Sequence, residues 1–348
     1  MKNVLITGGC GFIGSEAVRR IIKRDYKVFN FDKLTYASCQ ESLFNLPKDQ
    51  YSFFHGDIYN SHEINKFINF SKPTYILNFA AESHVDRSIE NPDNFINTNI
   101  IGTYNLLNES LNYYSSLDNK KKKNFKFIHV STDEVYGSLS LNDRPFTEED
   151  PYRPNSPYSS SKASSDFLVR SWNKTYNLPT IITHSSNNYG PWQFPEKLIP
   201  LTVLNALKGK PIQVYGDGSN IRDWIHVEDH VDALIKIMES DKVGETFNIG
   251  GSNELTNIDL VNKICDLLEI IQPNKKNKYS DLIEFVKDRP GHDNRYAISI
   301  EKIKDELSWE PKIQFSEGLN ASIKWMLDNF EWLSNKSSDE RRIGLKKI

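Results

Sequence analysis

The sequence predicts an α/β fold: a doubly wound parallel sheet, followed by a smaller C-terminal α/β domain. Short apolar runs alternate with longer helical patterns through residues 1–186, as expected where helices cover both faces of a parallel sheet. A glycine-rich turn joins the first apolar run to the first helical pattern. The length of 348 residues exceeds what one hydrophobic core usually organises. We therefore predict one domain over residues 1–186, which a segment near 225–250 rejoins, a second over 187–333, and a polar, flexible tail over 334–348.

Composition narrows the functional class. The 43 basic and 46 acidic residues nearly cancel to a net charge of -3, which disfavours a nucleic-acid protein or a basic membrane binder. The three cysteines are widely spaced and form no C-x-x-C, so neither a disulfide framework nor a zinc ribbon is indicated. No apolar run approaches the ~20 residues of a membrane span, and a strand begins too early to leave room for a signal peptide. We expect a soluble, cytoplasmic protein.

The first turn has the spacing of a phosphate-binding loop. The apolar run at residues 4–7 leads into Gly8, Gly9, Gly11 and Gly14, and a helical pattern runs from residue 12 to 24. In such a strand–turn–helix unit the glycines allow a tight turn, close approach of a pyrophosphate, and packing of helix on strand. The free N–H groups of the helix N-terminus favour an anion there. The sequence therefore predicts a Rossmann-type dinucleotide site.

An acid ends the second strand. Asp32 follows the apolar run at residues 27–31 and lies 23 residues after Gly9, close to the ~20 expected of the acid that binds the ribose diol. An acid at this position favours NAD over NADP because it repels a 2′-phosphate. The alternative is that Asp32 only caps a helix.

Two further strands and a long helix are expected in the first domain. The run at residues 52–54 leads to Asp57, which either meets the adenine edge or caps the helix from residue 61. The run at 74–79 ends in Ala80 and Ala81, whose small side chains would let a cofactor lie close. Residues 91–111 have a helical pattern that contains Asn99. The alternative to a binding role for Asn99 is that it is simply a buried polar residue.

Two adjacent acids end the fifth strand. The buried run at residues 127–130 leads into Ser131, Thr132, Asp133 and Glu134. Carboxylates at the end of a buried strand are costly unless they are paired or used, and ligands of open α/β sheets bind beyond the carboxyl ends of the strands. Neighbouring strand residues point to opposite faces, so the chain must turn by Asp133 if both acids are to act on one substrate.

A tyrosine and a lysine lie one helical turn apart in the next helix. Tyr158 and Lys162 have the i, i+4 spacing that places both on one helix face. A phenol has a pKa near ~10, so a role as base requires about 4 kcal/mol of phenolate stabilisation. The lysine and a nicotinamide cation would supply it. The alternative, a surface tyrosine beside a helical lysine, is common for this pattern alone.

Two other patterns indicate no function. The run of lysines at residues 120–123 has no interleaved aromatics and predicts a solvated loop rather than a nucleic-acid site. His226 and His230 have metal-ligand spacing, but no third ligand is near in sequence, so we expect no metal site.

The second domain alternates between strands, helices and loops. Strands are expected at residues 211–215, 222–227 and 245–249, and helices at 195–208, 228–238, 257–271, 299–307 and 315–330. Lys197, Arg222 and Arg289 fall in loops or at element ends, where arginine forks suit diphosphate oxygens.

Several of these stretches together resemble one family. The glycine turn with Tyr158-x-x-x-Lys162 resembles the extended short-chain dehydrogenase/reductase superfamily. Within it, the closer resemblance is to the nucleoside-diphosphate-glucose 4,6-dehydratases, over residues 2–330. The stretches that carry it are DKLTYA (32–37), AAESHVDRS (80–88), STDEVYG (131–137), NNYGP (187–191), FPEKLIP (194–200) and RPGHD (289–293).

The resemblance implies roles at individual positions. The implied catalytic residues are Thr132, Asp133, Glu134, Tyr158 and Lys162. The implied NAD-binding residues are Gly8, Gly11, Phe12, Ile13, Gly14, Asp32, Lys33, Leu34, Thr35, Asp57, Ile58, Ala80, Ala81, Glu82, Ser83, Thr98, Asn99, Tyr158, Lys162 and Asn188. The implied nucleotide-sugar contacts are His84, Thr132, Asn187, Lys197, Leu198, Gln213, Tyr215, Arg222, Asn257, Arg289 and His292.

Two positions depart from the family pattern. Cys10 stands where alanine is usual, which leaves a thiol near the pyrophosphate. Ser38 stands where glycine is usual, which puts the shape of that loop in doubt.

The implied reaction removes water from a nucleoside-diphosphate-glucose. Tyr158 would take the proton of the sugar O4 while NAD accepts hydride from C4, and Thr132 would bind O4. Glu134 would then take the C5 proton while protonated Asp133 supplies the leaving 6-hydroxyl with a proton. Hydride returns to C6, so NAD is regenerated. The two acids need different protonation states, so their environments must separate their pKa values.

Alternatives remain open. The resemblance favours dTDP-glucose, but thymine and uracil differ by one methyl, so UDP-glucose in a rhamnose-type pathway is the main alternative. An NDP-sugar 4-epimerase would not need the acid pair. A UDP-uronate decarboxylase would need a cationic group for the substrate carboxylate, and a GDP-mannose dehydratase usually prefers NADP. A non-catalytic NAD sensor often lacks the tyrosine or the lysine. The helices at 91–111 and 158–177 resemble those that form a four-helix homodimer interface in this superfamily.

Overall fold

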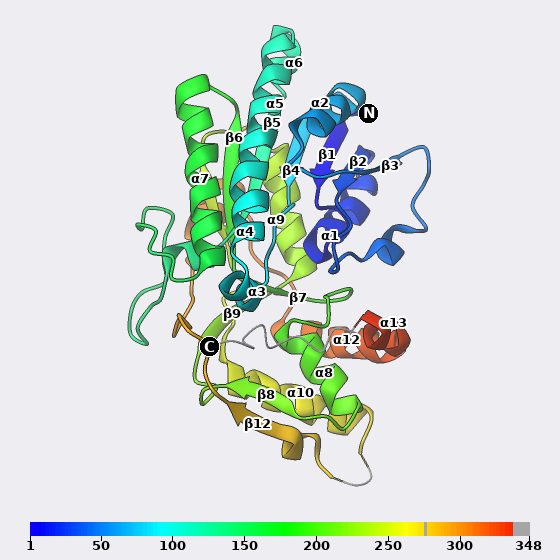
Figure 1. Ribbon diagram of the computed structural model, residues 1–348, viewed down its shortest axis with the longest axis vertical. Helices are drawn as coiled ribbons and strands as arrows, with labels where there is room; N and C mark the ends of the chain where they lie inside the picture. The colour runs from blue at the N-terminus through cyan, green and yellow to red at the C-terminus, as the bar shows by residue number, and fades with distance from the viewer. Residues whose placement is uncertain (275–276, 337–348) are drawn as a thin grey trace.

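The larger unit of the computed structural model is built on a seven-stranded parallel sheet (Figure 1). The structure describes residues 1–274 and 277–336. The order of the sheet is β10-β6-β5-β4-β1-β2-β3, and every neighbouring pair is parallel. The strands are β1 (Asn3–Thr7), β2 (Lys27–Asp32), β3 (Tyr51–His55), β4 (Tyr75–Asn78), β5 (Lys126–Thr132), β6 (Thr180–Ser185) and β10 (Thr246–Ile249). Because the order reverses at β1 and β4, a ligand crevice is expected beyond their carboxyl ends. The predicted doubly wound α/β fold is confirmed.

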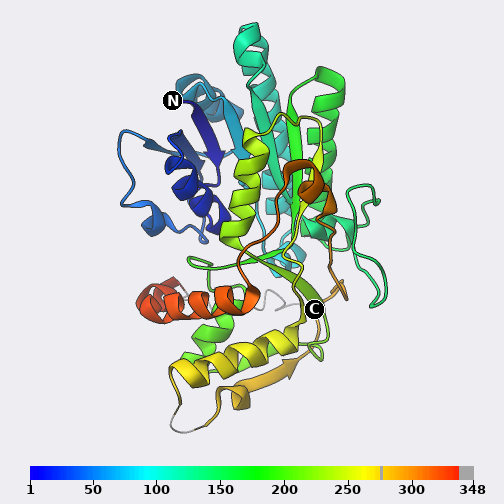
Figure 2. The ribbon, with the colours of Figure 1, turned by 180° about the vertical axis from the view of Figure 1, so that it is seen from behind.

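Helices cover both faces of this sheet (Figures 1 and 2). One face packs against α1 (Phe12–Ile22), α9 (Val227–Glu239) and α11 (Glu301–Leu307), whose apolar residues share a core with alternate residues of β1 and β2. The other face packs against α2 (Ser61–Ser71), α5 (Thr103–Ser116) and α7 (Pro157–Tyr176). Val4 and Leu5 are neighbours in β1 but belong to opposite cores, as strand alternation requires. The helix α11 comes from a segment that the sequence assigns to the second domain.

A smaller unit lies below the sheet in Figure 1. It contains a two-stranded sheet of β8 (Ile212–Tyr215) and β12 (Ile283–Val286), and a three-stranded sheet of β7 (Asn187–Tyr189), β9 (Ile221–His226) and β11 (Glu254–Thr256). Its helices are α8 (Leu198–Leu207), α10 (Asn257–Ile271), α12 (Phe315–Asp328) and α13 (Phe330–Lys336). These elements share a separate apolar core that includes Val214, Leu260 and Ile323.

Short elements connect these units. They are α3 (Val85–Glu90), α4 (Asp93–Phe95), the π-helix η2 (Ile96–Gly102), α6 (Asn119–Lys122) and the 3₁₀ helices η1 (Gln40–Leu43), η3 (Asp133–Tyr136) and η4 (Tyr279–Leu282). The helix predicted at residues 91–111 is therefore α4, η2 and α5 in succession.

One local expectation is wrong, and one strand was not predicted. The lysine run predicted as a loop forms the helix α6, because the side chain of Asp118 accepts a hydrogen bond from the backbone N–H of Lys121 and caps it. The strand β12 has no counterpart in the prediction; it pairs in parallel register with β8.

The predicted polar tail begins inside a helix. α13 continues to Lys336, whose Nζ donates to the carbonyl oxygen of Ser38 (3.2 Å) and pairs with Glu41 (3.0 Å). Residues 337–348 of this prediction lie outside the described residues. No helix within the described part of the chain has the length and apolar content needed to span a membrane.

Candidate active site

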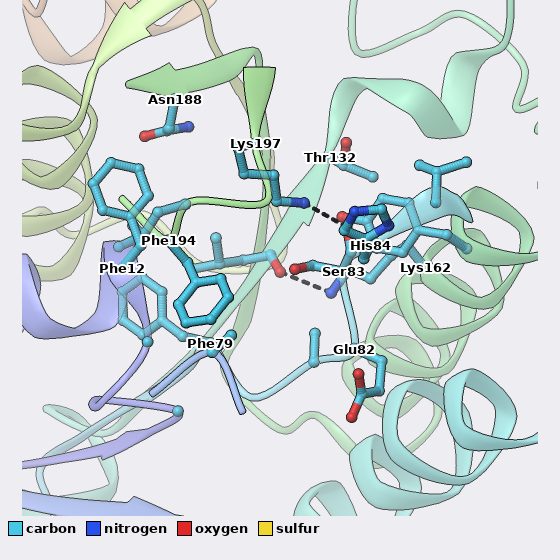
Figure 3. Close-up of a pocket in the computed structure, with 18 of the residues that line it drawn as sticks. Phe12, Phe79, Glu82, Ser83, His84, Thr132, Lys162, Asn188, Phe194 and Lys197 are labelled. Carbon is cyan, nitrogen blue, oxygen red and sulfur yellow. Dashed lines mark hydrogen bonds between the residues drawn. The ribbon is translucent and has the colours of Figure 1, made fainter. Parts of the chain in front are cut away.

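A cavity of about 440 Å³ lies at the carboxyl ends of the parallel strands, between the sheet and the smaller unit. It extends from the glycine turn, past the end of β5, to the loop after β12. Figure 3 shows Phe12 and Phe79 on one side of it and Thr132, His84 and Lys162 on the other. Predicted site residues that line it are Gly8, Gly11, Phe12, Ile13, Gly14, Asp32, Lys33, Thr35, Asp57, Ile58, Ala80, Ala81, Glu82, Ser83, His84, Thr98, Thr132, Glu134, Tyr158, Lys162, Asn187, Asn188, Lys197, Leu198, Tyr215, Arg222, Asn257, Arg289 and His292.

The glycine turn is compact for steric reasons. Gly8 has φ +72, and a Cβ there would lie 2.6 Å from the backbone nitrogen of Ala80. A Cβ on Gly14 would lie 2.2 Å from the carbonyl oxygen of Gly8. Both positions therefore require glycine. A Cβ on Gly11 would touch only that carbonyl oxygen, at 3.3 Å, so this position leaves the cavity open for a ligand.

Asp32 holds two loops beside the cavity. Its Oδ2 accepts from the backbone N–H of Cys10 (2.8 Å), and its Oδ1 accepts from that of Leu34 (2.8 Å). Burial raises the pKa of this carboxyl, while the two backbone N–H groups lower it. The helix-capping alternative does not apply, because no helix begins at Asp32.

The thiol of Cys10 points away from the cavity. Cys10 is fully buried, and its sulfur accepts a hydrogen bond from Nδ2 of Asn30 at 3.3 Å. The same Asn30 accepts from the backbone N–H of Gly9 through Oδ1 (3.1 Å). Burial and the nearby Asp32 raise the pKa of the thiol to about 12, so it stays protonated. Cys10 belongs to the glycine turn, but its thiol is packed against Asn30 and does not line the cavity.

The structure excludes the capping alternative for Asp57 and shows the loop shape at Ser38. Asn60 caps α2, since its side chain accepts from the backbone N–H groups of His62 and Glu63. Asp57 instead lines the cavity and pairs with Lys33 at 2.7 Å. Ser38 closes a turn through its N–H to the carbonyl oxygen of Thr35 (3.1 Å), so serine is accommodated there.

Asn99 supports the cavity wall from behind. Its amide accepts from the N–H of Glu82 (2.9 Å) and donates to the carbonyl oxygen of Glu82 (3.0 Å) and to Ser161 Oγ (2.8 Å). Asn99 is 1% exposed and does not line the cavity. Its predicted direct cofactor contact stays a prediction.

The chain turns at the end of β5. The strand ends at Thr132, and Asp133 begins the 3₁₀ helix η3. The hydroxyl of Thr132 accepts from the backbone N–H of Glu134 (3.3 Å), which starts this helix. Glu134 therefore lines the cavity rather than entering the core. The carboxyl of Asp133 is 2% exposed, and its Oδ2 has no hydrogen-bond partner.

The two acids have different electrostatic surroundings. Burial, then Glu134 and Asp223, hold the pKa of Asp133 well above its usual value. Burial also raises the pKa of Glu134, but three cations oppose this effect: Arg289, Arg222 and Lys197. The surroundings therefore favour a protonated Asp133 beside a more readily ionised Glu134.

Tyr158 and Lys162 reach the cavity from one face of α7. Burial and Glu134 raise the pKa of Tyr158, whereas a hydrogen bond with Thr132 lowers it. Lys162 Nζ donates to the carbonyl oxygen of Val130 (2.9 Å), and burial lowers its pKa to about 8. The protein alone therefore opposes a phenolate, and a bound cation would be needed to favour one.

Basic side chains from the smaller unit line the same cavity as Glu134 and Tyr158. Arg222 stacks on the ring of Tyr296 at 4.2 Å and donates to the carbonyl oxygen of Asp293 (2.9 Å). His292 Nδ1 contacts Asp288 at 2.7 Å; burial and the arginines lower its pKa to about 4. Lys197 approaches from the loop before α8 and donates to the carbonyl oxygen of Ser83 (3.0 Å; Figure 3).

Four predicted residues lie outside the cavity lining, and several lining residues were not predicted. Leu34, Asn99, Asp133 and Gln213 do not line it. Lining residues absent from the prediction are Phe31, Ala37, Ser38, Gly56, Phe79, Val85, Asp86, Val130, Ser131, Ser185, Ser186, Gln193, Phe194, Glu196, Trp224 and Tyr296. Glu196 could have been found inside the quoted FPEKLIP stretch; it accepts from the hydroxyl of Tyr36 (3.2 Å).

Known proteins resemble this chain over most of its length. The family model described as GDP-mannose 4,6 dehydratase matches residues 5–322. A dTDP-glucose 4,6-dehydratase of Salmonella typhimurium is 53% identical over 96% of this chain and 95% of its own. This chain belongs to the dTDP-glucose 4,6-dehydratase family.

Solved structures of the dehydratase family have the same fold. A dTDP-glucose 4,6-dehydratase of Bacillus anthracis, in complex with NAD, has a TM-score of 0.83 and 45% identity, covering 97% of this chain and 100% of that one. DesIV of Streptomyces venezuelae, with NAD and TYD bound, has a TM-score of 0.87 and 38% identity, covering 96% and 99%. A UDP-glucose 4-epimerase of Thermotoga maritima also matches, at TM-score 0.82, 27% identity and coverage of 94% and 99%.

Proposed function

We propose that this protein is an NAD-dependent hydro-lyase that converts dTDP-glucose to dTDP-4-keto-6-deoxyglucose and water. The observation that carries the proposal is the turn at Asp133. It presents Glu134 to the cavity that Tyr158 and Lys162 also line, while burying the carboxyl of Asp133 beside it. An epimerase on the same fold has no use for this acid pair.

The residues around the glycine turn fit NAD. Asp32 presents an acid at the end of β2, and Gly11 leaves room beside the N-terminus of α1. An acid at this position disfavours the 2′-phosphate of NADP. When bound, NAD would supply the hydride acceptor and donor of the reaction and, in its oxidised form, a positive charge.

Tyr158 and Thr132 would act on the sugar O4. Tyr158 as a phenolate removes the hydroxyl proton when C4 is oxidised. Lys162, held by the carbonyl oxygen of Val130, supplies positive charge from within the fold. Thr132 lies within hydrogen-bond reach of Tyr158, so one hydroxyl can bind O4 and guide the proton transfer.

Glu134 and Asp133 would carry out the elimination. The 4-ketone acidifies the C5 hydrogen, which the carboxylate of Glu134 removes. Asp133, kept protonated by burial, donates its proton to the leaving 6-hydroxyl. The surroundings support this division of roles: burial raises the pKa of both carboxyls, but Arg289, Arg222 and Lys197 oppose the rise at Glu134, whereas Glu134 and Asp223 add to it at Asp133.

Product analysis tests the proposal. Purified protein is incubated separately with dTDP-glucose, UDP-glucose and dTDP-galactose, and the 4-keto product is detected by its absorbance in alkali. We expect the product from dTDP-glucose. Faster turnover of UDP-glucose would instead place the enzyme in a UDP-sugar, rhamnose-type pathway. Interconversion of glucose and galactose forms without a 4-keto product would identify an epimerase.

We further propose that the protein is a homodimer formed through η2, α5 and α7. These helices expose apolar side chains on the outer side of the fold: Ile96 (46%), Ile101 (39%), Tyr104 (43%), Phe167 (59%) and Tyr176 (49%). Joining two copies of this surface would bury these side chains in a four-helix arrangement.

A further inference from the structure

Asp86 joins the two units of the molecule through a buried carboxylate. It lies in the first turn of α3, which follows β4, and is 2% exposed. Its Oδ1 accepts from NH1 of Arg289 at 3.1 Å, and its Oδ2 accepts from the hydroxyl of Tyr215 at 3.0 Å. Both carboxylate oxygens are thus used by side chains of the smaller unit.

The two partners of Asp86 lie near the ends of one small sheet. Tyr215 is the last residue of β8, and Arg289 lies three residues beyond the last residue of β12. Tyr215 and Val286 are paired in register, and the N–H of Gly216 donates to the carbonyl oxygen of Val286 (2.9 Å). The carboxylate therefore contacts a unit of two strands rather than two independent loops.

The orientation of the Arg289 guanidinium depends on this contact. Its side chain is 17% exposed, and Asp86 is its only ion-pair partner within the described residues. Its Nε has no hydrogen-bond partner, although it is buried. A guanidinium has five donors in a rigid fork, so the bond to Asp86 orients the fork and leaves other donors for a ligand.

The same arginine also acts on the proposed catalytic base. Arg289 is the first of the three cations that lower the pKa of Glu134. All three of Asp86, Arg289 and Tyr215 line the cavity. Movement of Arg289 would therefore change both the binding surface and the charge next to Glu134.

We propose that Asp86 is a positioning residue for the nucleotide sugar: it holds Arg289 and Tyr215 across the boundary between the two units, in the orientation that receives the diphosphate. This inference rests on the proposed function. It differs from a purely structural role because it predicts a defect in substrate binding that passes through Arg289.

Asp86→Asn tests the inference, because asparagine keeps the size and one acceptor but removes the charge. We expect the Kd for dTDP, measured by calorimetry, and the KM for dTDP-glucose each to rise about tenfold, the scale of one lost charge-assisted hydrogen bond. We expect kcat to fall less than KM rises. Retention of NAD should not change.

A double-mutant cycle separates positioning from structure. If Asp86 acts through Arg289, the double variant Asp86→Asn/Arg289→Ala should bind dTDP no more weakly than Arg289→Ala alone. Asp229→Asn is the matched control: this buried carboxylate accepts from the N–H groups of Lys312 and Ile313 and does not line the cavity. It should lower the Tm without changing the Kd for dTDP.

The outcomes distinguish the inference from the proposed function. An unchanged Kd and KM in folded Asp86→Asn, or fully additive effects with Arg289→Ala, would overturn the inference while the wild type still forms product. A wild type that binds dTDP but forms no 4-keto product would refute the proposed function. Weaker dTDP binding by Asp86→Asn would support the inference even then.

Discussion

At the residue scale, the central feature is a change of backbone direction between two acids. Thr132 is extended at φ -135 and ψ 148, and the next residue is already in the 3₁₀ helix η3. Strand alternation alone would have separated Asp133 and Glu134 onto opposite faces of the sheet. The turn instead puts Glu134 at the cavity and leaves Asp133 buried behind it.

Asp133→Asn should stop the reaction after the first oxidation. Asparagine cannot supply a proton to the leaving hydroxyl, so C4 oxidation should persist while elimination slows by about 10²–10⁴-fold. Single-turnover absorbance of the reduced nicotinamide should rise and then stay high, with little 4-keto-6-deoxy product. Unimpaired loss of water in this variant would remove Asp133 from its role as acid.

The rate of elimination should depend on pH in two directions. Glu134 acts as a carboxylate, so the rate rises as pH passes its raised pKa. Asp133 acts as an acid, so the rate is maintained below its strongly raised pKa and falls as pH rises through it. A single-turnover pH profile should therefore be bell-shaped, and Asp133→Asn should lack the alkaline fall. A profile of identical shape in both proteins would contradict this assignment.

At the element scale, α7 positions the proposed base through its cap. The side chain of Ser156 accepts from the backbone N–H of Ser159, and Ser159 returns a contact to the N–H of Ser156, which forms a capping box. Pro157 occupies the first helical position, where its missing N–H costs nothing. Tyr158 follows directly, so the start of this helix fixes where the phenol enters the cavity.

Ser156→Ala should destabilise the fold by about 1 kcal/mol, the usual cost of losing a helix N-cap. Activity should fall as well, because Tyr158 lies two residues away. Ser164→Ala is a suitable control: Ser164 is half-buried within the same helix, away from its N-cap, and its hydroxyl donates to the carbonyl oxygen of Ser160. The free energy of unfolding in denaturant and kcat are measured on both variants, and we expect Ser156→Ala to lose more of each than Ser164→Ala. Equal loss in both would show that the cap has no special importance.

At the scale of the whole molecule, strand order brings distant residues to one crevice. The glycine turn follows β1, the alanines follow β4 and the acids follow β5, and these three strands are neighbours in the sheet. The smaller unit then lines the crevice with cations from segments that lie more than 60 residues after the end of β5.

Phe167→Glu should convert the proposed dimer to a monomer. A charge placed in the joined surface of α5 and α7 would have to be desolvated on association. Phe285→Glu is the matched control, since both phenylalanines are 59% exposed and Phe285 lies on β12, in the other unit. Light scattering should give the dimer mass for wild type and control, and the monomer mass for Phe167→Glu. A monomeric wild type would refute the interface.

Local patterns in the sequence were sufficient to predict the parallel sheet, and the family resemblance supplied most of the predicted residues around the cavity. Strand–turn–helix units with glycine, and apolar runs that end in Asp32 or Thr132, depend on short-range rules of backbone and burial. These rules put the glycine turn, Asp32, Thr132 and Glu134 at strand ends that border the cavity. They were also sufficient to identify most helices of the smaller unit.

Only the tertiary structure showed which side chains and strands from distant segments contact one another. The sequence could not show that the thiol of Cys10 points to Asn30, that Asn60 rather than Asp57 caps α2, or that β12 pairs with β8. It also did not reveal that Asp86 holds Arg289 and Tyr215, which are 203 and 129 residues away in the chain. Side-chain direction and long-range pairing depend on packing between distant segments, whereas strand ends and glycine turns are determined within a few residues.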